Sequence, residues 1–357
     1  MTQRKSKAPL LGLVLFGSTL LTLLGLELAL RLISGAGLLA IPDSNARISM
    51  IGRVYPGSFD PALGYLPTPG ASAHNPIWNT TAHIGWDGVR SNGEQQPTPK
   101  GVPLIVVGDS FTYGDEVDDR GTWPSELERL LGRPVINGGV FGYGLDQAVL
   151  RSEVLLETFE ADFLIVSLIA DDVTRCEYSY RYFWKPYFDF TDGALVRHND
   201  PVPEPHVLPP GDDLLRRSLR ASFLADFVLR RLDPSDWLVR GSVRVHERGE
   251  EVSRLLLDRL ADAAQARGHG LLVVIQWVPG GDSRRAQPLI DRAAERGVDL
   301  LSIEEPLRAA IESPGFSKRS FFHVRSVSGN PEQVGHMSAE GNRFVAEAIS
   351  KRLAGKI

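Results

Sequence analysis

The sequence has almost no cysteine, and its charges are nearly balanced. Cys176 is the single cysteine among 357 residues, so no intramolecular disulfide can form and no cysteine-based metal site fits. The formal net charge of -5 at pH 7 gives no reason to expect nucleic acid as a partner. Internal repeats are absent, and the glycine loop "GGVFGYG" lacks the lysine that a phosphate-binding P-loop requires. The remaining composition, 43% hydrophobic and 23% charged, is that of a globular protein of one or two domains.

One long apolar run stands at the N-terminus. It covers Leu10–Leu30, follows three basic residues, and contains one charge, Glu27. About 20 apolar residues are needed to cross a bilayer core, whereas the apolar part of a signal peptide usually has about 7–15. The sequence therefore predicts an uncleaved signal anchor over residues 1–33, with a cleaved signal peptide as the alternative and the later residues outside the cytoplasm. Glu27 and Arg31 are expected to pair on one face of this helix near the membrane interface.

The rest of the chain divides into an irregular stretch and a regular one. Residues 34–101 are rich in Gly, Pro, Asn and Ser, and predict short strands and turns without a core of their own. Over residues 102–357, short apolar runs alternate with amphipathic stretches, which is typical of a parallel sheet covered by helices on both faces. An insertion at about residues 174–248 follows a strand end and predicts a lid over it, with an excursion on the flank of the domain as the alternative.

The expected strands are Leu104–Val107, Val135–Asn137, Phe163–Leu168, Leu271–Trp277 and Val298–Leu301. The expected helices are Trp123–Leu131, Leu145–Thr158, Val252–Arg267, Pro288–Arg296, Pro306–Ile311 and Ser338–Leu353, the last with a serine cap.

Four polar or glycine-rich motifs fall at the ends of these strands or before the final helix. They are "GDSFTYG", "INGGVFGYGLDQ", "LIVSLIADDV" and "VGHMSAEGN". In open α/β sheets the chemistry lies at the carboxyl ends of the strands. A serine hydroxyl is a poor nucleophile until a base takes its proton, and His336 is the histidine in a suitable loop before a helix. The pattern therefore predicts Ser110 as a nucleophile and His336 as its base, with Asp109 capping the turn.

These four motifs resemble those of the SGNH hydrolases, also called the GDSL family, and in particular their membrane-anchored bacterial members. The resemblance covers residues 102–357 and implies a flavodoxin-like three-layer α/β/α sandwich. It also implies that Ser110 is the nucleophile and His336 the base, and that the Gly142 and Ser110 amides form the oxyanion hole. A single-pass protein of the bacterial inner membrane with a periplasmic catalytic domain is the location that follows.

Two positions depart from the family pattern. Asp171, followed by Asp172, stands where the family has its oxyanion asparagine, and the family's aspartate two or three residues before the histidine is missing. Glu332 is the nearest upstream carboxylate and is the predicted acid of the triad. Asp171, Asp172, Glu304 or a Ser–His dyad without an acid are the alternatives.

The charge of Asp171 conflicts with the chemistry expected at its position. An ionised carboxylate beside a developing oxyanion is repulsive by about 4 kcal/mol at roughly 4 Å and an effective dielectric of about 20. Asp171 therefore either is buried and protonated, so that it donates as asparagine would, or points elsewhere and has another role.

The resemblance and the anchor together imply an extracytoplasmic serine esterase or O-deacetylase acting on an acylated envelope polysaccharide, an exported polysaccharide or a small ester. An O-acetyltransferase using the same site is one alternative, and a catalytically degenerate glycan-binding or scaffold protein is another. No cofactor or metal is expected. The aromatic residues at 178–187 suit stacking on sugars, although aromatic clusters of this kind more often belong to a core.

Overall fold

The computed structural model describes residues 8–35, 37, 55–205, 219, 221–232, 242–325 and 333–357. The chain forms two compact units, one made of Met1–Met50 with Leu208–Ser242 and the other of Ile51–Val207 with Val243–Ile357. The irregular stretch from residue 51 onward thus belongs to the same unit as the sheet. The second half of the insertion belongs with the N-terminal helix, a division that differs from the boundaries expected from the sequence.

The second unit is built on a five-stranded sheet of order β14-β13-β7-β5-β6, in which every pairing is parallel. These strands are β5 (Leu104–Gly108), β6 (Val135–Asn137), β7 (Phe163–Ile169), β13 (Gly270–Gln276) and β14 (Asp299–Ser302). Numbered along the chain, the order reads 2-1-3-4-5, which is the flavodoxin-like arrangement. Every residue of β5 and β7 is buried, as expected for strands covered on both faces.

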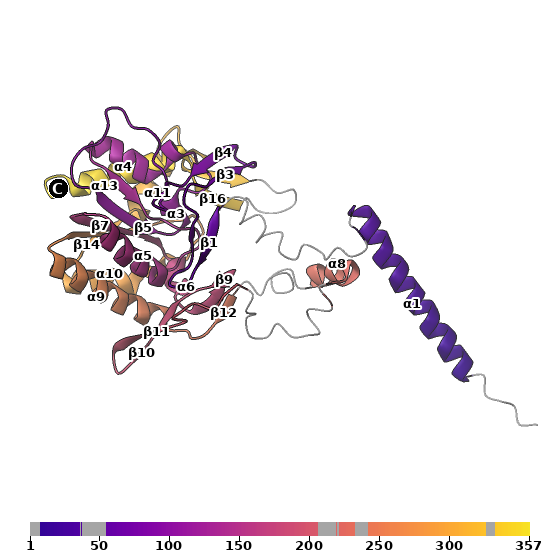
Figure 1. Ribbon diagram of the computed structural model, residues 1–357. Helices are drawn as coiled ribbons and strands as arrows, with labels where there is room; N and C mark the ends of the chain where they lie inside the picture. The colour runs from indigo at the N-terminus through magenta and orange to yellow at the C-terminus, as the bar shows by residue number, and fades with distance from the viewer. Residues whose placement is uncertain are drawn as a thin grey trace, which may run out of the picture. The chain divides into compact units, whose positions relative to one another are not determined.

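Helices cover the sheet on both faces and make a three-layer α/β/α sandwich (Figure 1). On one face lie α5 (Leu145–Thr158), α9 (Gly249–Arg267) and α10 (Gln287–Arg296), whose apolar side chains share a core with Ile105 and Val166. On the other face lie α4 (Trp123–Leu131), α11 (Glu304–Glu312) and α13 (Ala339–Leu353), which pack with Val106 and Ile165. The predicted fold class is confirmed.

Local sequence signals explain where several helices begin and end. Thr122 caps α4 by accepting from the Ser125 amide at 3.2 Å, and Gly132 ends that helix in a left-handed conformation. Ser338 caps α13 by accepting from the Gly341 amide at 3.2 Å, as predicted.

One expectation about the strand ends is refined and another is wrong. Asp171 and Asp172 follow the end of β7 as expected, and they also open a short helix, α6 (Asp171–Arg175). His336 does not lie in a loop, because it belongs to β16 (Gln333–Met337), which pairs antiparallel with β15 (Phe322–Arg325). The alternating run "VGHM" supplies the side chains for this short hairpin.

The irregular stretch and the first half of the insertion form small antiparallel sheets in the second unit. In the irregular stretch β1 (Gly57–Asp60) pairs with β2 (Gly64–Pro67), and β3 (Ser72–Asn75) with β4 (Thr80–His83). The insertion contributes β8 (Tyr178–Arg181), β9 (Phe183–Trp184), β10 (Tyr187–Thr191), β11 (Ala194–His198) and β12 (Ser242–Arg244).

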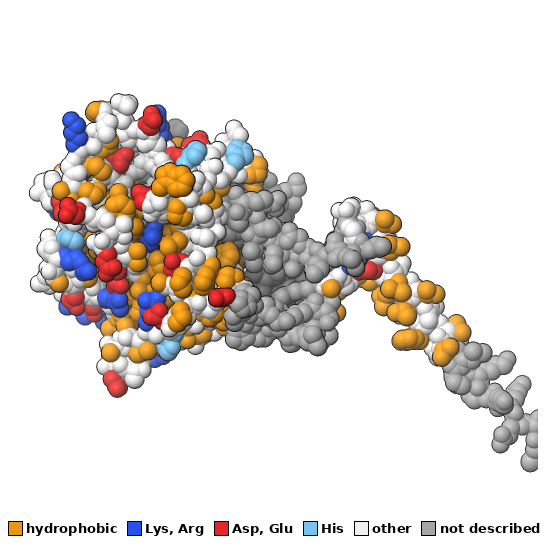
Figure 2. All heavy atoms as spheres, viewed as in Figure 1, with side chains coloured by type: hydrophobic (Ala, Val, Ile, Leu, Met, Phe, Trp, Pro, Cys, Tyr) orange, Lys and Arg blue, Asp and Glu red, His pale blue; other side chains and the backbone are white. Residues whose placement is uncertain are grey.

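The first unit contains two described helices, α1 (Ala8–Ile33) and α8 (Phe223–Leu232). Within α1, the segment Gly12–Ile33 has a mean hydropathy of 2.0 and is long and apolar enough to cross a membrane. Hydrophobic side chains lie along the visible face of this helix (Figure 2). Length and composition are thus compatible with a span, and equally with a signal sequence.

Candidate active site

Ser110 lies at the carboxyl end of β5, in the first position of a one-turn helix, α3 (Ser110–Tyr113). Asp109 caps this turn, because its Oδ1 accepts from the Phe111 amide at 2.9 Å, as the sequence predicted. Gly108 allows the strand to end against β7, since a Cβ there would lie 2.1 Å from the Ser167 carbonyl oxygen. The motif is therefore a turn that presents a serine at the edge of the sheet.

His336 meets this serine from the other end of the sequence. Its Nε2 lies 2.8 Å from the Ser110 Oγ, which is hydrogen-bond distance for a base and its nucleophile. The Phe111 ring packs beside the imidazole with 4.9 Å between ring centroids, and Ser110 is only 4% exposed. The structure thus brings together the two residues on which the sequence analysis placed the chemistry.

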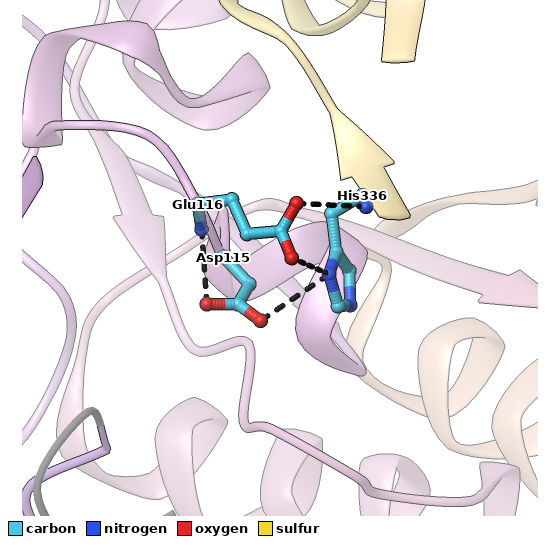
Figure 3. A group of neighbouring side chains, drawn as sticks. All are labelled: Asp115, Glu116 and His336. Atoms are coloured by element: carbon cyan, nitrogen blue, oxygen red, sulfur yellow. Dashed lines mark hydrogen bonds and ion pairs between the residues drawn. The ribbon is translucent and has the colours of Figure 1, made fainter. Parts of the chain in front are cut away.

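Two carboxylates face the opposite nitrogen of the same imidazole (Figure 3). Asp115 Oδ2 lies 3.2 Å from His336 Nδ1, and Glu116 Oε1 lies 3.5 Å from it. The other oxygen of Glu116, Oε2, accepts from the His336 backbone amide at 3.1 Å. Asp115 also accepts from the Glu116 backbone amide at 2.9 Å through its Oδ1. Glu116 therefore contacts both the ring and the strand that carries it, whereas Asp115 contacts the ring and its own turn.

The turn that carries these carboxylates is held in place from the irregular stretch. Arg90 is buried, and its guanidinium donates to the carbonyls of Tyr113 at 3.2 Å, Gly114 at 2.8 Å and Val117 at 2.9 Å. These carbonyls lie on either side of the acid pair. Gly114 turns the chain with φ of 81°, and the residue after Asp115 has φ of 68°, a conformation that is uncommon without glycine.

Gly335 makes room for the second carboxylate. A Cβ at this position would lie 2.6 Å from Glu116 Oε2. Glycine is therefore needed here for close approach, because any side chain would push the carboxylate away from the His336 amide.

Burial and charge shift the pKa values of all three groups. Burial raises the pKa of Asp115 to about 6, and the charge of Glu116 adds to this while His336 opposes it. Burial acts in the same direction on Glu116, but hydrogen bonds from His336 outweigh it and lower its pKa. For His336, burial favours the neutral ring, but the two carboxylates outweigh it and raise the pKa to about 9. The two carboxylates therefore favour the protonated imidazole at neutral pH, and the neutral base forms at higher pH.

The Gly142 loop is oriented by side chains from outside the regular sandwich. Tyr65 donates from its hydroxyl to the Phe141 carbonyl at 2.7 Å, and Arg181 donates to the Gly142 carbonyl at 3.2 Å. Because C=O and N–H point in opposite directions across a trans peptide, the first bond directs the Gly142 N–H away from Tyr65. In the described part of the chain neither this amide nor that of Ser110 donates a hydrogen bond. Within the described residues, both amides therefore lack an acceptor of their own.

A second acid pair, Asp171 and Asp172, surrounds a guanidinium instead of an imidazole. Arg175 donates to Asp172 Oδ1 at 2.6 Å, to Asp171 Oδ2 at 2.8 Å and to Asp109 Oδ2 at 3.1 Å. Asp172 is buried and also accepts from the Ile169 amide at 3.0 Å. Burial and the charge of Asp109 raise the pKa of Asp172, against the attraction of Arg175.

Asp171 is not the buried donor considered as one alternative. Its side chain is 53% exposed, and its carboxylate accepts from Arg175 and lies 3.7 Å from Arg181. A carboxylate engaged with guanidinium groups acts as an acceptor, so the position does not replace the donating asparagine of the family pattern.

A cavity of about 750 Å³ opens beside His336. His336, Phe111 and Asp171 line one part of it, and Trp277 and Arg285 line another. It runs along the carboxyl ends of the strands, and its size is within the usual range for small-molecule sites.

The predicted triad acid, Glu332, lies outside the described residues. Glu304, an alternative, lines the cavity and pairs with Arg308 at 2.7 Å. The sequence analysis missed Asp115 and Glu116, which follow Ser110 by five and six residues. The signal was present in "GDSFTYGDEV", where a glycine after the one-turn helix brings the next two residues back toward the serine.

The same cluster has the spacing of a possible divalent-cation site. One donor atom from each of Asp115, Glu116 and His336 lies within 4.8 Å of the others. The set of one imidazole and two carboxylates suits several divalent metals.

The sequence matches no protein-family model and is not significantly similar to any curated protein. Several solved structures are similar in fold. A lipolytic protein of the G-D-S-L family from Desulfitobacterium hafniense DCB-2 is 13% identical, with a TM-score of 0.40 over 71% of this chain and 100% of that one. An acetylxylan esterase from Geobacillus stearothermophilus, solved as a catalytic mutant, is 12% identical, with a TM-score of 0.40 over 71% and 95%. A two-domain esterase active on acetylated mannans is 12% identical, with a TM-score of 0.40 over 71% of this chain and 49% of that one.

Proposed function

We propose that this protein is a serine esterase of the SGNH type, in which Ser110 forms an acyl-enzyme. The observation that carries the proposal is the 2.8 Å contact between Ser110 Oγ and His336 Nε2, with two carboxylates on the far nitrogen of the same ring. Nucleophile, base and orienting acid are the three parts that an activated serine requires.

The steps follow from these positions. Neutral His336 takes the Ser110 proton at Nε2 as Oγ attacks the ester carbonyl, and Asp115 and Glu116 stabilise the imidazolium that forms. The amides of Ser110 and Gly142 hold the oxyanion. The imidazolium then protonates the leaving alcohol, and a water activated by the same imidazole releases the acid from Ser110.

The proposed substrate is an acylated polysaccharide of the envelope or one that is exported, and the proposed location is the outer face of a bacterial inner membrane. The apolar span of α1 supports this location, and the cavity beside His336 supports a substrate larger than a simple ester. Water is the proposed acceptor of the acyl group.

A fluorophosphonate probe tests the proposal, because it reacts only with an activated serine. At pH 9.5, where His336 is a free base, the wild type and Ser283→Ala should be labelled at equal rates and Ser110→Ala should not be labelled. Ser283 is the matched control, since it lines the same cavity without touching the imidazole. Absence of label on the wild type would favour the non-catalytic glycan-binding alternative.

A further inference from the structure

The first unit contains a helix-to-helix contact that the esterase site does not use. Of residues 12–35 in α1 and the turn after it, all are exposed except Gly17, Glu27, Leu30 and Arg31. The two charged side chains at the end of this apolar helix are therefore among its most shielded residues. A helix packed on a soluble core shows the reverse pattern.

The Glu27 carboxylate caps the N-terminus of α8. It accepts from the Phe223 amide at 3.0 Å, from the Leu224 amide at 2.8 Å and from the Ser222 hydroxyl at 2.8 Å. The first amides of a helix have no partner within the helix, and a negative charge beside them is favourable. The acid that a membrane helix would otherwise carry at a cost is thus satisfied by a second helix.

Arg31 reinforces the same contact, as expected for its pairing with Glu27. Its Nε donates to Glu27 Oε1 at 2.7 Å, and its terminal nitrogen donates to the Ala221 carbonyl at 3.0 Å. Its guanidinium also lies 4.8 Å from the centre of the Phe223 ring. The predicted pairing of Glu27 with Arg31 is confirmed.

The position of this contact along α1 sets its depth. Glu27 is six residues from the end of the helix at Ile33, about 9 Å at 1.5 Å per residue. If α1 spans the bilayer, α8 begins about 9 Å inside the end of the span, at the boundary between lipid headgroups and acyl chains, where a charged pair that is satisfied by its own partners is tolerated.

The outward side of α8 is apolar. Phe227 is 43% exposed, Val228 42% and Leu232 75%, and Arg231 is exposed beside them. A short amphipathic helix with aromatic and aliphatic side chains next to arginine has the composition of an interfacial membrane helix.

We propose that α8 is an interfacial helix. Phe227, Val228 and Leu232 insert between phospholipid headgroups in the leaflet where α1 ends, and Glu27 tethers the helix there. The lipid surface is the occupant because α1, which holds α8, is itself exposed and apolar over a bilayer's thickness. This inference rests on the proposed membrane span of α1, and it is independent of the esterase site.

Spin labels on the full-length protein in phosphatidylcholine vesicles test the proposal. Cys176 is replaced by Ala, and single cysteines at Val228, Leu232, Leu20 and Val154 carry a nitroxide. Val154 is the aqueous control because it is exposed on α5 of the other unit. Collision with oxygen relative to a water-soluble nickel chelate should be at least about threefold higher at Val228 and Leu232 than at Val154, and highest at Leu20.

Two different failures remain distinguishable. If Leu20 reports hydrocarbon but Val228 and Leu232 match Val154, the interfacial helix is overturned while the span stands. If Leu20 also matches Val154, the span itself is overturned and the inference with it.

The tether is tested by Glu27→Leu, which makes α1 more apolar and removes the cap. The oxygen preference at Val228 should fall to less than about half, with Leu28→Ala as the neighbouring control that leaves it unchanged. Ester turnover should not change in either variant. An unchanged oxygen preference in Glu27→Leu would overturn the tethering role.

Discussion

Two pairs of adjacent acids, Asp115–Glu116 and Asp171–Asp172, lie near the nucleophile, and they differ in the cation that they surround. The first pair faces His336, whose charge depends on pH. The second pair faces Arg175, which is charged at every relevant pH. Two similar acidic dipeptides thus differ in function: the first can influence the protonation of its partner, and the second can only pair with a fixed charge.

The difference shows that an acid gains a role in proton transfer from its partner and not from its own burial. Asp172 is as well buried as Asp115, yet its partner Arg175 does not lose a proton in proteins and so cannot act as a base. Its proposed role is to fix α6 and, through Arg175, the turn at Asp109. Asp115 and Glu116 are proposed to set the basicity and the direction of the catalytic imidazole.

The largest expected effect comes from removing the first pair. In the double variant Asp115→Asn with Glu116→Gln, kcat for an aryl ester should fall by about four decades, because the imidazole loses both its orientation and the stabilisation of its cation. Each single variant should lose less, since the other carboxylate remains. Steady-state kinetics at pH 9.5 measures this, and near-normal turnover in the double variant would exclude both acids from the mechanism.

Removing the buried member of the second pair should affect stability instead. Asp172→Asn leaves part of the Arg175 charge uncompensated and should cost about 3 kcal/mol of unfolding free energy. Chemical denaturation of the second unit checks this, and kcat per folded molecule should change much less than in the Asp115 variant. If stability is unaffected while turnover collapses, the contrast between the two pairs is wrong.

The pH profile should separate the pairs more finely. The kcat/KM of the wild type should rise about tenfold per pH unit up to about pH 9, where His336 loses its proton, and then level off. Asp115→Asn removes a negative charge that favours the imidazolium, so the pKa that governs the rise of kcat/KM should move toward the ordinary histidine value of about 6.5. Asp171→Asn should leave this pKa unchanged. If the kcat/KM of the wild type already reached its plateau at pH 7, Asp115 and Glu116 would not raise the pKa of His336 as described.

Glu116 clamps the His336 strand by accepting from the His336 backbone amide. Disturbing this clamp is a smaller change than removing either carboxylate. Gly335→Ala places a methyl group 2.6 Å from Glu116 Oε2 and should displace that carboxylate. A drop in kcat of about tenfold is expected, with little change in KM, because Asp115 still orients the ring. Gly57→Ala is the control, because a Cβ there would make only ordinary contacts, the nearest 3.5 Å from the Leu66 carbonyl oxygen. Equal activities of wild type and Gly335→Ala would show that the clamp is dispensable.

The smallest effect is expected from Asp171→Asn. Because this side chain is half-exposed and accepts from Arg175, its neutralisation should change kcat by less than about threefold at any pH. A large gain in activity at neutral pH would revive its role as a protonated oxyanion donor. A complete loss would make the carboxylate itself essential.

Most of the sandwich could be predicted from the sequence because its signals are local. Trp123–Leu131 and Leu145–Thr158 have the same bounds in the structure, since apolar periodicity marks both helices and Thr122 caps the first. The apolar runs likewise give the strands to within one residue at each end. The end of the insertion and the residues before His336 do not follow from such signals.

The acid pair of the site could not be predicted in the same way. Asp115 and Glu116 follow Ser110 closely, but their approach to His336 depends on a return turn that a distant Arg90 holds. The family resemblance directed attention to the residues just before His336 instead. The choice between the two roles considered for Asp171 could not be made from the sequence for a similar reason, because its exposure and its arginine partner are tertiary properties.

Arg90 and Tyr65 also decide how far the enzyme can be shortened. Both precede the first strand of the sheet, yet one holds the turn of the acid pair and the other holds the peptide before Gly142. A fragment that begins at residue 102 would retain every strand of the sandwich and both Ser110 and His336, but it would lose both of these supports. An active fragment is therefore expected to start before Tyr65.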